Sequence, residues 1–300
     1  MENIKVSIII PAYNEEEGIK STLIELMYEL EQSSNQWEIV VVDDGSIDST
    51  YENVVSIQHS GIKCIQQKHN KGYGAAIKAG IREASGDIIA WYDADGQHRP
   101  EDLKGVVECL MANDYDYCIG VRDERSFVDK NRRFGKKILS FIANIMAKDK
   151  VPDVNSGLRA FKANVIRKYI SMLPDRFGAS TVTTFIMQEI DAWGGYYPII
   201  VRQRMGKSTV KRFRDGFATL KLIMRIIIDF RPMQVFGTSG LVLTIIGLIY
   251  GIVKAIYEGL GVPTLSVIFI LFGIQEIFFG IISLQIGRVR LEILENRESV

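Results

Sequence analysis

Short apolar runs alternate with amphipathic segments along the amino-terminal two thirds of the chain. The apolar runs cover residues 5–10, 38–42, 63–66, 87–92, 115–119 and 198–201. Residues 15–31 have the apolar spacing of a helix, a second helix is expected over 75–84, and Pro100 is placed to begin another. Strands that alternate with helices in this way are typical of an α/β fold whose sheet is mainly parallel.

The carboxyl-terminal part has a different pattern, because residues 233–257 and 264–287 are almost wholly apolar. Each segment exceeds the roughly 20 residues that an α-helix needs to cross a bilayer. A buried helical hairpin of a soluble domain is the competing interpretation, but the length of both segments favours a transmembrane hairpin. Glu276 lies inside the second segment, where an ionisable residue is costly and often functional.

Positive charges flank this hairpin at its two open ends. They are Lys221, Arg225 and Arg231 before the first span, and Arg288, Arg290 and Arg297 after the second, whereas the link has only Lys254 nearby. Positive residues favour the cytoplasmic side, so we expect a two-span membrane protein with both chain ends in the cytoplasm. The first residues carry no signal-peptide pattern, which agrees with this orientation.

Two basic amphipathic segments precede the spans. Residues 215–230 combine a wide apolar face with basic residues, which predicts a helix in the membrane interface, although a helix packed on the sheet would show the same pattern. Residues 133–148 are a second candidate of this kind.

Composition excludes some classes of function. The chain has 300 residues, of which 47% are hydrophobic, and this is enough for a sizeable core. Its zero net charge argues against a general nucleic-acid binder. Its three cysteines have no Cys-x-x-Cys spacing, so neither a zinc site nor a disulfide framework is indicated.

The candidate chemistry lies where predicted strands end. Asp93-Ala94-Asp95 follows the run 87–92, and in an open parallel sheet ligands collect at the carboxyl ends of the strands. Carboxylate oxygens suit Mg²⁺ or Mn²⁺, although an isolated acidic pair is more often only a solvated turn. Three further stretches are expected at the same edge: Pro11-Ala12-Tyr13-Asn14-Glu15, Val42-Asp43-Asp44-Gly45-Ser46 and Lys68-His69-Asn70-Lys71-Gly72-Tyr73-Gly74. Each is a weak signal by itself, because Asp-Gly is a common turn and the glycines lack the spacing of a P-loop.

Taken in order, these four motifs resemble those of the family 2 glycosyltransferases over residues 5–211. The two spans, and the tract Asp153-Val154-Asn155-Ser156-Gly157-Leu158-Arg159, further resemble the branch that glycosylates polyprenyl phosphates, such as dolichyl-phosphate mannose synthase. The resemblance implies a nucleotide-sugar-binding, Rossmann-like sheet of the GT-A type. It divides the chain into a catalytic domain (1–211), a juxtamembrane amphipathic helix (212–232), a transmembrane hairpin (233–287) and a cytoplasmic tail (288–300).

The resemblance also implies roles for individual residues. The nucleotide sugar is expected at Pro11, Tyr13, Glu15, Val42, Asp44, Asp93, Ala94 and Asp95. A Mg²⁺ or Mn²⁺ ion is expected at Asp93, Asp95 and Gln97, with His98 beside them in a structural role. The acceptor phosphate is expected at Arg122, Arg202, Arg204 and Lys211, and the catalytic residues at Asp93, Asp95 and Arg202. Lys211 departs from the family's Gly-x-Ser-Lys ending, and anionic lipid headgroups are an alternative partner for it.

The implied reaction is the metal-dependent, inverting transfer of a hexose from a UDP- or GDP-sugar to a polyprenyl phosphate at the cytoplasmic membrane face. A phosphate monoester is already anionic near neutral pH, so no strong general base is required, and the family position that can hold a carboxylate falls near Thr184. The alternatives are another lipid or polysaccharide acceptor, or a non-catalytic membrane scaffold. Self-association through the spans is compatible with each of these.

Overall fold

The computed structural model describes residues 4–127, 151–204, 225, 228–259 and 261–296. The chain separates into two compact units, residues 1–220 and 221–300, which are described in turn. The helix predicted over 133–148, most of the one predicted over 215–230, and Lys211 lie outside the described residues.

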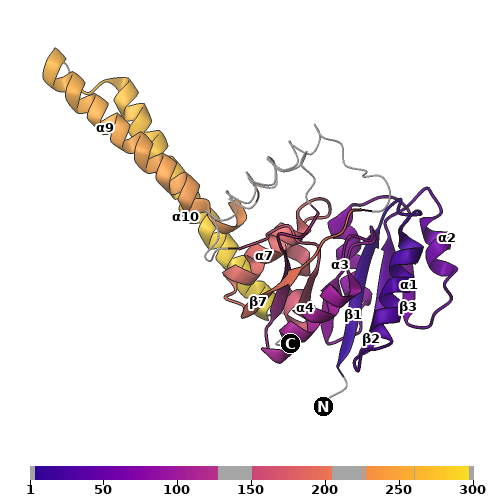
Figure 1. The fold of residues 1–300 in the computed structure, drawn as a ribbon. Coiled ribbons are helices and arrows are strands. Elements are labelled where there is room, and N and C mark those ends of the chain that lie inside the picture. The colour runs from indigo at the N-terminus through magenta and orange to yellow at the C-terminus, as the bar shows by residue number, and fades with distance from the viewer. Residues whose placement is uncertain (1–3, 128–150, 205–224, 226–227, 260, 297–300) are drawn as a thin grey trace. The chain divides into compact units, whose positions relative to one another are not determined.

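A seven-stranded, mainly parallel sheet forms the centre of the first unit as described (Figure 1). In spatial order the strands are β3 (Ile62–Gln66), β2 (Gln36–Asp43), β1 (Lys5–Ala12), β4 (Ile88–Trp91), β6 (Arg159–Lys162), β5 (Tyr117–Arg122) and β7 (Gly194–Ile199). Strand β6 pairs antiparallel with both of its neighbours, and the other described pairs are parallel. The predicted α/β fold is therefore confirmed.

Two strands differ from the sequence prediction. Strand β6 was not predicted, because it is four residues long and has a charged residue at each end. Strand β7 lies four residues before the predicted run 198–201, since its first residues are Gly194 and Gly195, which have no apolar side chain to mark a strand. Pairing with β5 makes this segment extended.

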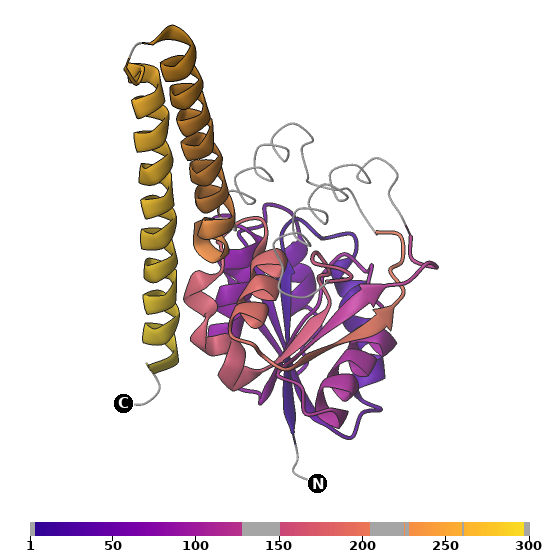
Figure 2. The ribbon, with the colours of Figure 1, turned by 90° about the vertical axis from the view of Figure 1, so that its left-hand side faces the viewer.

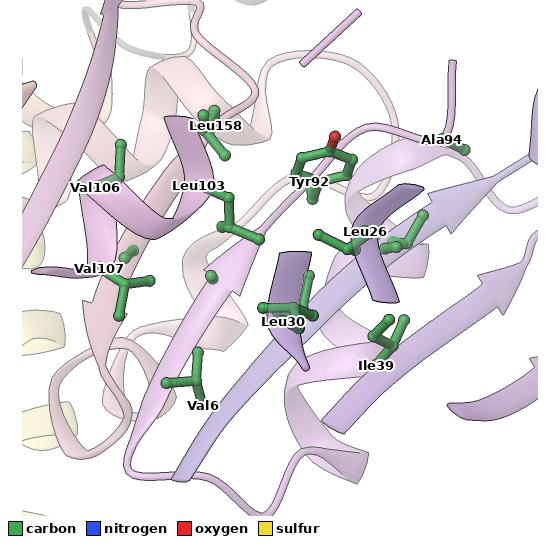
Figure 3. Close-up of a cluster of buried hydrophobic side chains, with 14 of the residues drawn as sticks. Val6, Leu26, Leu30, Ile39, Tyr92, Ala94, Leu103, Val106, Val107 and Leu158 are labelled. Carbon is green, nitrogen blue, oxygen red and sulfur yellow. The ribbon is translucent and has the colours of Figure 1, made fainter. Parts of the chain in front are cut away.

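Helices cover both faces of the sheet. Side chains from α1 (Ile19–Leu30), α2 (Thr50–Val55) and α4 (Pro100–Ala112) join one buried cluster with alternate residues of the central strands. In Figure 3, Leu26 and Leu30 of α1 and Leu103 of α4 lie over the sheet with Val6 and Ile39. This face forms the main core.

The opposite face carries α3 (Tyr73–Glu83) and α7 (Ala179–Glu189). Helix α3 packs closely on the sheet at Gly80, where a Cβ atom would lie only 2.3 Å from Cγ2 of Ile9. Helix α7, which the sequence analysis did not predict, receives a hydrogen bond from Arg159 of β6. Helix α6 (Ala163–Lys168) and the 3₁₀ turn η2 (Ile170–Met172) connect β6 to α7.

The second unit is a hairpin of two long helices, seen side by side in Figure 2. A π-helical turn, η3 (Met233–Gly237), leads into α9 (Thr238–Glu258), and α10 spans Thr264–Asn296. Mean hydropathy reaches 2.0 in the first helix and 2.3 in the second, and only 17% of each apolar window is buried inside the structure. Both helices are therefore long and apolar enough to cross a membrane, and most of their apolar surface is exposed.

Helix α10 continues beyond the predicted span end at residue 287. Its last turns contain Arg288, Arg290 and Glu292, which are good helix formers but too polar for a bilayer core. The apolar part therefore still ends where the sequence predicts, while the backbone of the predicted tail is helical as far as Asn296.

Small residues bring the two helices of the hairpin together. A Cβ atom on Gly273 would lie 2.3 Å from Oγ1 of Thr244 and 2.5 Å from the carbonyl oxygen of Gly240. Ser239 of α9 hydrogen-bonds the carboxyl group of Glu276 on α10. The polar group that was unexplained in the sequence therefore has a partner on the neighbouring helix.

We expect Gly273→Ala to separate the helices, since the added methyl group has no space between them. Overpacking of this kind costs about 1–3 kcal/mol, so the thermal unfolding midpoint of the detergent-solubilised protein should fall. Gly261→Ala is the matched control, because a Cβ atom there meets nothing within 4 Å. Equal midpoints for the two variants would contradict this packing.

A second prediction concerns Glu38 on β2, which accepts hydrogen bonds from the Ser7 hydroxyl at 2.5 Å and the Ser85 N–H at 2.6 Å and pairs with Lys5 at 3.1 Å. Burial raises the pKa of Glu38, but these bonds outweigh it and lower the pKa from 4.5 to about 2. The stabilisation is therefore complete above pH 4.5 and is lost as the pH falls towards 2.

Glu38→Gln should thus destabilise the first unit by about 1 kcal/mol at pH 7, allowing for solvent screening, and by less at pH 3. Urea unfolding followed by tryptophan fluorescence measures this, because Trp37, Trp91 and Trp193 all lie in the first unit. The exposed Glu31→Gln is the control. A loss of stability that does not depend on pH would refute the assignment.

Candidate active site

The strand directions bring the predicted motifs to one edge of the sheet. Strands β1, β2 and β4 are parallel, so Glu15, Asp44 and Asp93 follow their carboxyl ends at the same edge. The loop before antiparallel β6 and the segment after β7 reach this edge as well. Pro11 pairs with Val42 in the register of β1 and β2, beneath the loops that form the edge. Tyr13 follows β1 and is half-buried, and Ala94 is buried between the two aspartates.

Asp44 holds the loop between β3 and α3. Its side chain is 2% exposed and accepts hydrogen bonds from the backbone N–H groups of Lys71, at 2.9 Å, and Gly72, at 2.7 Å. Gly72 has φ of +109°, a conformation that a side chain would strain. Burial raises the pKa of Asp44 and the two N–H donors oppose that shift. The carboxylate predicted to meet a nucleoside thus also fixes a loop.

The backbone N–H groups in the first turn of α3 donate to the chain segment that precedes α7. The N–H of Gly74 donates to the carbonyl of Arg176 at 3.2 Å, and the N–H of Ala75 donates to that of Asp175 at 2.7 Å. A Cβ atom on Gly74 would lie 1.9 Å from the carbonyl oxygen of Pro174. These amides therefore hold a chain segment, and glycine is needed here for its close approach.

Asp93 is hydrogen-bonded through both carboxylate oxygens. The Tyr73 hydroxyl donates to Oδ1 at 3.1 Å, and Nε2 of His98 lies 3.2 Å from Oδ2. Burial raises the pKa of Asp93, but the bonds from His98 and Tyr73 outweigh it and hold the pKa below its usual value. Asp93 is therefore an anion with fixed partners.

Asp95 and Glu15 share the guanidinium of Arg204. Arg204 hydrogen-bonds Glu15 and lies 3.6 Å from Oδ2 of Asp95. Burial raises the pKa of Glu15 to about 7, against the attraction of Arg204, and burial together with the charge of Asp93 raises the pKa of Asp95. Negative charge is thus in excess at this edge of the sheet.

Arg202 and Gln97 are hydrogen-bonded to each other, and the backbone N–H of Gln97 also donates to Oδ1 of Asp95 at 3.2 Å. The N–H of Arg202 donates to the carbonyl of Gln97 at 2.8 Å, and the Gln97 side-chain amide donates to the carbonyl of Arg202 at 3.1 Å. The Arg202 guanidinium pairs with Glu25 of α1 at 2.6 Å. Of the two arginines predicted to bind phosphate here, the structure therefore places Arg204 at the acidic centre and Arg202 beside α1.

Arg122 at the end of β5 forms a two-point ion pair with Asp153, with both N–O distances at 2.5 Å. Burial lowers the pKa of Arg122, but Asp153 outweighs that effect and raises it. Asp153 begins the tract that the sequence analysis singled out, so this pair anchors the tract at the sheet edge.

Arg159 ends the same tract and is a residue for which the sequence analysis predicted no role. It is fully buried, lies 5.7 Å over the Trp91 ring, and donates to the carbonyls of Ser156 and Ser180. It also donates to the Thr184 hydroxyl at 3.2 Å, so the position that can hold a carboxylate in the family is here a buried partner of an arginine. Arg159 is buried because β6 lies beside β4 in the sheet and α7 packs over it, and the sequence predicts neither β6 nor α7.

The residues fit a divalent cation by the chemistry of their donor atoms. Asp93 and Asp95 offer carboxylate oxygens, the backbone N–H of Gln97 donates to Oδ1 of Asp95, and the surplus of buried negative charge would be neutralised by such an ion. In the part of the chain that the structure describes, no three histidine, cysteine, aspartate or glutamate side chains form a metal cage. Mg²⁺ needs no such cage, since it is commonly held by one or two carboxylates plus substrate phosphates.

Comparison with protein-family models gives two matches. Residues 7–170 match the model described as glycosyl transferase family 2, and residues 231–289 match the one described as GtrB C-terminal hairpin. Both halves of the predicted architecture are therefore found together in one chain.

Two curated relatives illustrate the match. The UDP-N-acetylglucosamine–dolichyl-phosphate N-acetylglucosaminyltransferase of Methanococcus voltae is 33% identical over 183 residues, which are 54% of this chain and 71% of the relative. The undecaprenyl-phosphate 4-deoxy-4-formamido-L-arabinose transferase of Proteus mirabilis is 24% identical over 311 residues, which cover 95% of this chain and 89% of the relative.

A solved structure has the same fold. Glucosyl-3-phosphoglycerate synthase from Mycobacterium tuberculosis, in complex with Mn²⁺, UDP and phosphoglyceric acid, superposes with a TM-score of 0.58 at 18% identity, covering 75% of this chain and 78% of that one. Another structure of that enzyme contains Mg²⁺ and UDP. At this identity the likeness shows the fold, which is GT-A.

We predict that Asp44→Asn loosens the loop at residues 70–74. An asparagine keeps one acceptor oxygen and turns an NH₂ group towards the second backbone N–H, so the protein should lose about 1–2 kcal/mol of stability. The thermal midpoint should fall, and the amides of Lys71 and Gly72 should exchange hydrogen faster. Asp114→Asn, at a side chain that is 93% exposed, is the control. Unchanged exchange at both amides would contradict the clamp.

Proposed function

Because the chain belongs to glycosyl transferase family 2, we propose that it transfers a hexose from a UDP- or GDP-sugar to a polyprenyl phosphate at the cytoplasmic face of a membrane. The observation that carries this proposal is the pairing of a family 2 catalytic fold with a hairpin of membrane-spanning length in a single chain. A relative that matches along 95% of this chain is named as an undecaprenyl-phosphate sugar transferase.

The nucleotide sugar would bind at the carboxyl ends of β1, β2 and β4. In this proposal Pro11, Tyr13, Glu15, Val42 and Asp44 contact the nucleoside, and Asp93, Ala94 and Asp95 lie at the diphosphate. Asp44 keeps its loop bonds while doing so, because each carboxylate oxygen can accept more than one hydrogen bond.

A Mg²⁺ or Mn²⁺ ion would be held by Asp95, with Asp93 and Gln97 beside it. When bound, such an ion stabilises the negative charge that develops on the departing nucleoside diphosphate. Arg204, which lies 3.6 Å from Asp95, supplies a positive charge at the same place and remains within reach of the diphosphate.

The acceptor phosphate would attack the anomeric carbon from the face opposite the leaving group, so the configuration inverts. The bond to the diphosphate oxygen breaks with its electron pair as the bond to the acceptor oxygen forms. A phosphate monoester has its second pKa at about 6 and needs no strong base, which is consistent with a threonine at position 184.

Arg122 and Arg202 are the candidate contacts for the acceptor phosphate, together with Lys211. Each of the two arginines has a carboxylate partner, Asp153 for Arg122 and Glu25 for Arg202. A phosphate would compete with these partners for the guanidinium groups, and Arg202 is accessible for this exchange because its side chain is 40% exposed.

The membrane segments would bring this site to its lipid substrate. A polyprenyl chain stays in the bilayer, so the enzyme has to meet the phosphate at the surface, and the hairpin at 233–287 together with an interfacial helix at 212–232 would keep it there. The basic residues flanking both spans favour placing the catalytic domain (1–211) and the tail (288–300) in the cytoplasm.

The test is lipid labelling by membranes that contain the protein. The membranes are incubated with a panel of radiolabelled UDP- and GDP-sugars, and the label in the lipid extract is counted. We expect lipid-linked label from at least one donor, its loss on chelation of divalent cations, and its return with added Mg²⁺ or Mn²⁺. Label in a polymer or in another lipid would support the alternative acceptors, and no product from any donor would support the scaffold.

Within this assay, Asp95→Asn should lower transfer roughly a hundred-fold or more, because several kcal/mol of charge stabilisation are removed. Asp114→Asn should transfer at the wild-type rate. The exposed side chain of Asp114 pairs with Lys162, the last residue of β6, and β6 runs antiparallel to β4, so Asp114 lies at the opposite edge of the sheet from the acidic motif. Wild-type turnover by the Asp95 variant would contradict the metal site, but it would not bear on whether polyprenyl phosphate is the acceptor.

A further inference from the structure

We propose that Tyr73 and His98 are positioning residues that hold the Asp93 carboxylate in one orientation for the sugar donor and its metal ion. This inference rests on the proposed function; it gives a specific task to His98, for which the sequence predicts only a structural role, and to Tyr73, for which it predicts none. Neither is predicted to touch the ion itself.

The first step is the geometry around Asp93. Its Oδ1 accepts from the Tyr73 hydroxyl at 3.1 Å, and its Oδ2 lies 3.2 Å from Nε2 of His98. Gly157 closes a third side, because a Cβ atom there would lie 2.1 Å from Oδ2. A carboxylate gripped at both oxygens and walled by backbone cannot rotate, yet each oxygen keeps a lone pair for a ligand.

The second step concerns the direction of the His98 hydrogen bond. An ionised carboxylate only accepts, so Nε2 carries the hydrogen. The other ring nitrogen, Nδ1, is buried and has no hydrogen-bond partner among the described residues, so a second N–H there would be buried without an acceptor. The hydrogen that faces Asp93 is therefore on Nε2, and Nδ1 has no group to donate to. Tyr92 steadies it, since its hydroxyl donates to the His98 carbonyl at 2.6 Å and the two rings lie 5.8 Å apart.

The third step concerns Tyr73. Its hydroxyl is the donor in the bond to Oδ1 of Asp93, because an ionised carboxylate only accepts. Tyr73 is the first residue of α3, and that turn is held by the Asp44 carboxylate on one side and by the carbonyls of Asp175 and Arg176 on the other. The donor to Asp93 therefore sits on a backbone that is fixed from two directions.

The consequence is a division of labour between the two aspartates. Both oxygens of Asp93 accept hydrogen bonds, whereas among the described residues Asp95 is contacted by the Gln97 N–H at 3.2 Å and by Arg204 at 3.6 Å. Like charges in close proximity repel, so an untethered Asp93 would swing away from Asp95. Tyr73 and His98 prevent this and so keep both carboxylates turned to the same ligand.

The experiment measures Mn²⁺ binding to the full-length protein in detergent, by electron paramagnetic resonance and with no nucleotide present. Tyr73→Phe and His98→Asn should each weaken Mn²⁺ binding roughly tenfold, as loss of a residue that orients a metal ligand does. His98→Gln should bind Mn²⁺ almost as the wild type does, because its amide N–H reaches the position of Nε2. In an Asp93→Ala background none of these substitutions should weaken binding further.

Wild-type affinity in both Tyr73→Phe and His98→Asn would overturn the inference, and so would an equal further loss in the Asp93→Ala background. Circular dichroism and the thermal midpoint of each variant separate these results from misfolding. His98→Gln remains informative if His98→Asn does not fold, since it tests rescue of the same hydrogen bond.

A second readout needs no metal. The chain has three histidines, so ¹⁵N-histidine labelling gives three imidazole spectra. One should show a hydrogen on Nε2 and should change in Asp93→Ala and vanish in His98→Gln. An Nδ1–H tautomer for His98 would overturn the inference. If the wild type binds no Mn²⁺, the metal part of the proposed function fails, and this spectrum alone decides the role of His98.

Discussion

Buried negative charge at one edge of the sheet is the constraint on which the active site depends. Parallel strands bring Asp44, Asp93 and Asp95 to the same place, and burial disfavours the ionised form of each. The structure compensates with donors from segments far away in sequence, including backbone N–H groups after β3, the Tyr73 hydroxyl and the Arg204 guanidinium. The loops take the shape they have because these carboxylates must be satisfied.

The second unit solves a different problem. Its helices keep their backbone hydrogen bonds within themselves and leave apolar side chains exposed, as a bilayer requires and water would penalise. Between the helices the contacts are made by small residues such as Gly240 and Gly273, and by the bond from Ser239 to Glu276. The first unit therefore buries its apolar residues, and the second exposes them. The change in composition along the chain predicts where the second unit begins for this reason.

The candidate site was predictable in outline and less so in detail. Asp93 and Asp95 were expected at the end of a strand and lie there, because an apolar run that stops at a carboxylate marks a sheet edge. Arg202 and Arg204 were both expected at a phosphate; in the structure the guanidinium of Arg202 pairs with Glu25, and that of Arg204 contacts Glu15 and Asp95. Which of two nearby arginines reaches a site depends on where the extended segment after β7 is tied, and here the tie is the backbone of Gln97.

The sequence by itself determined the alternation of strands and helices from β1 to β5, the mainly parallel sheet, the two apolar spans and the edge at which polar residues gather. These follow from the periodicity of side chains, which is local. Only the tertiary structure decided that Tyr73, His98 and Gly157 surround Asp93, and that short, charged β6 enters the sheet beside β4. Contacts at the site join residues up to 189 positions apart, as between Glu15 and Arg204, and no local pattern encodes a hydrogen bond across that separation.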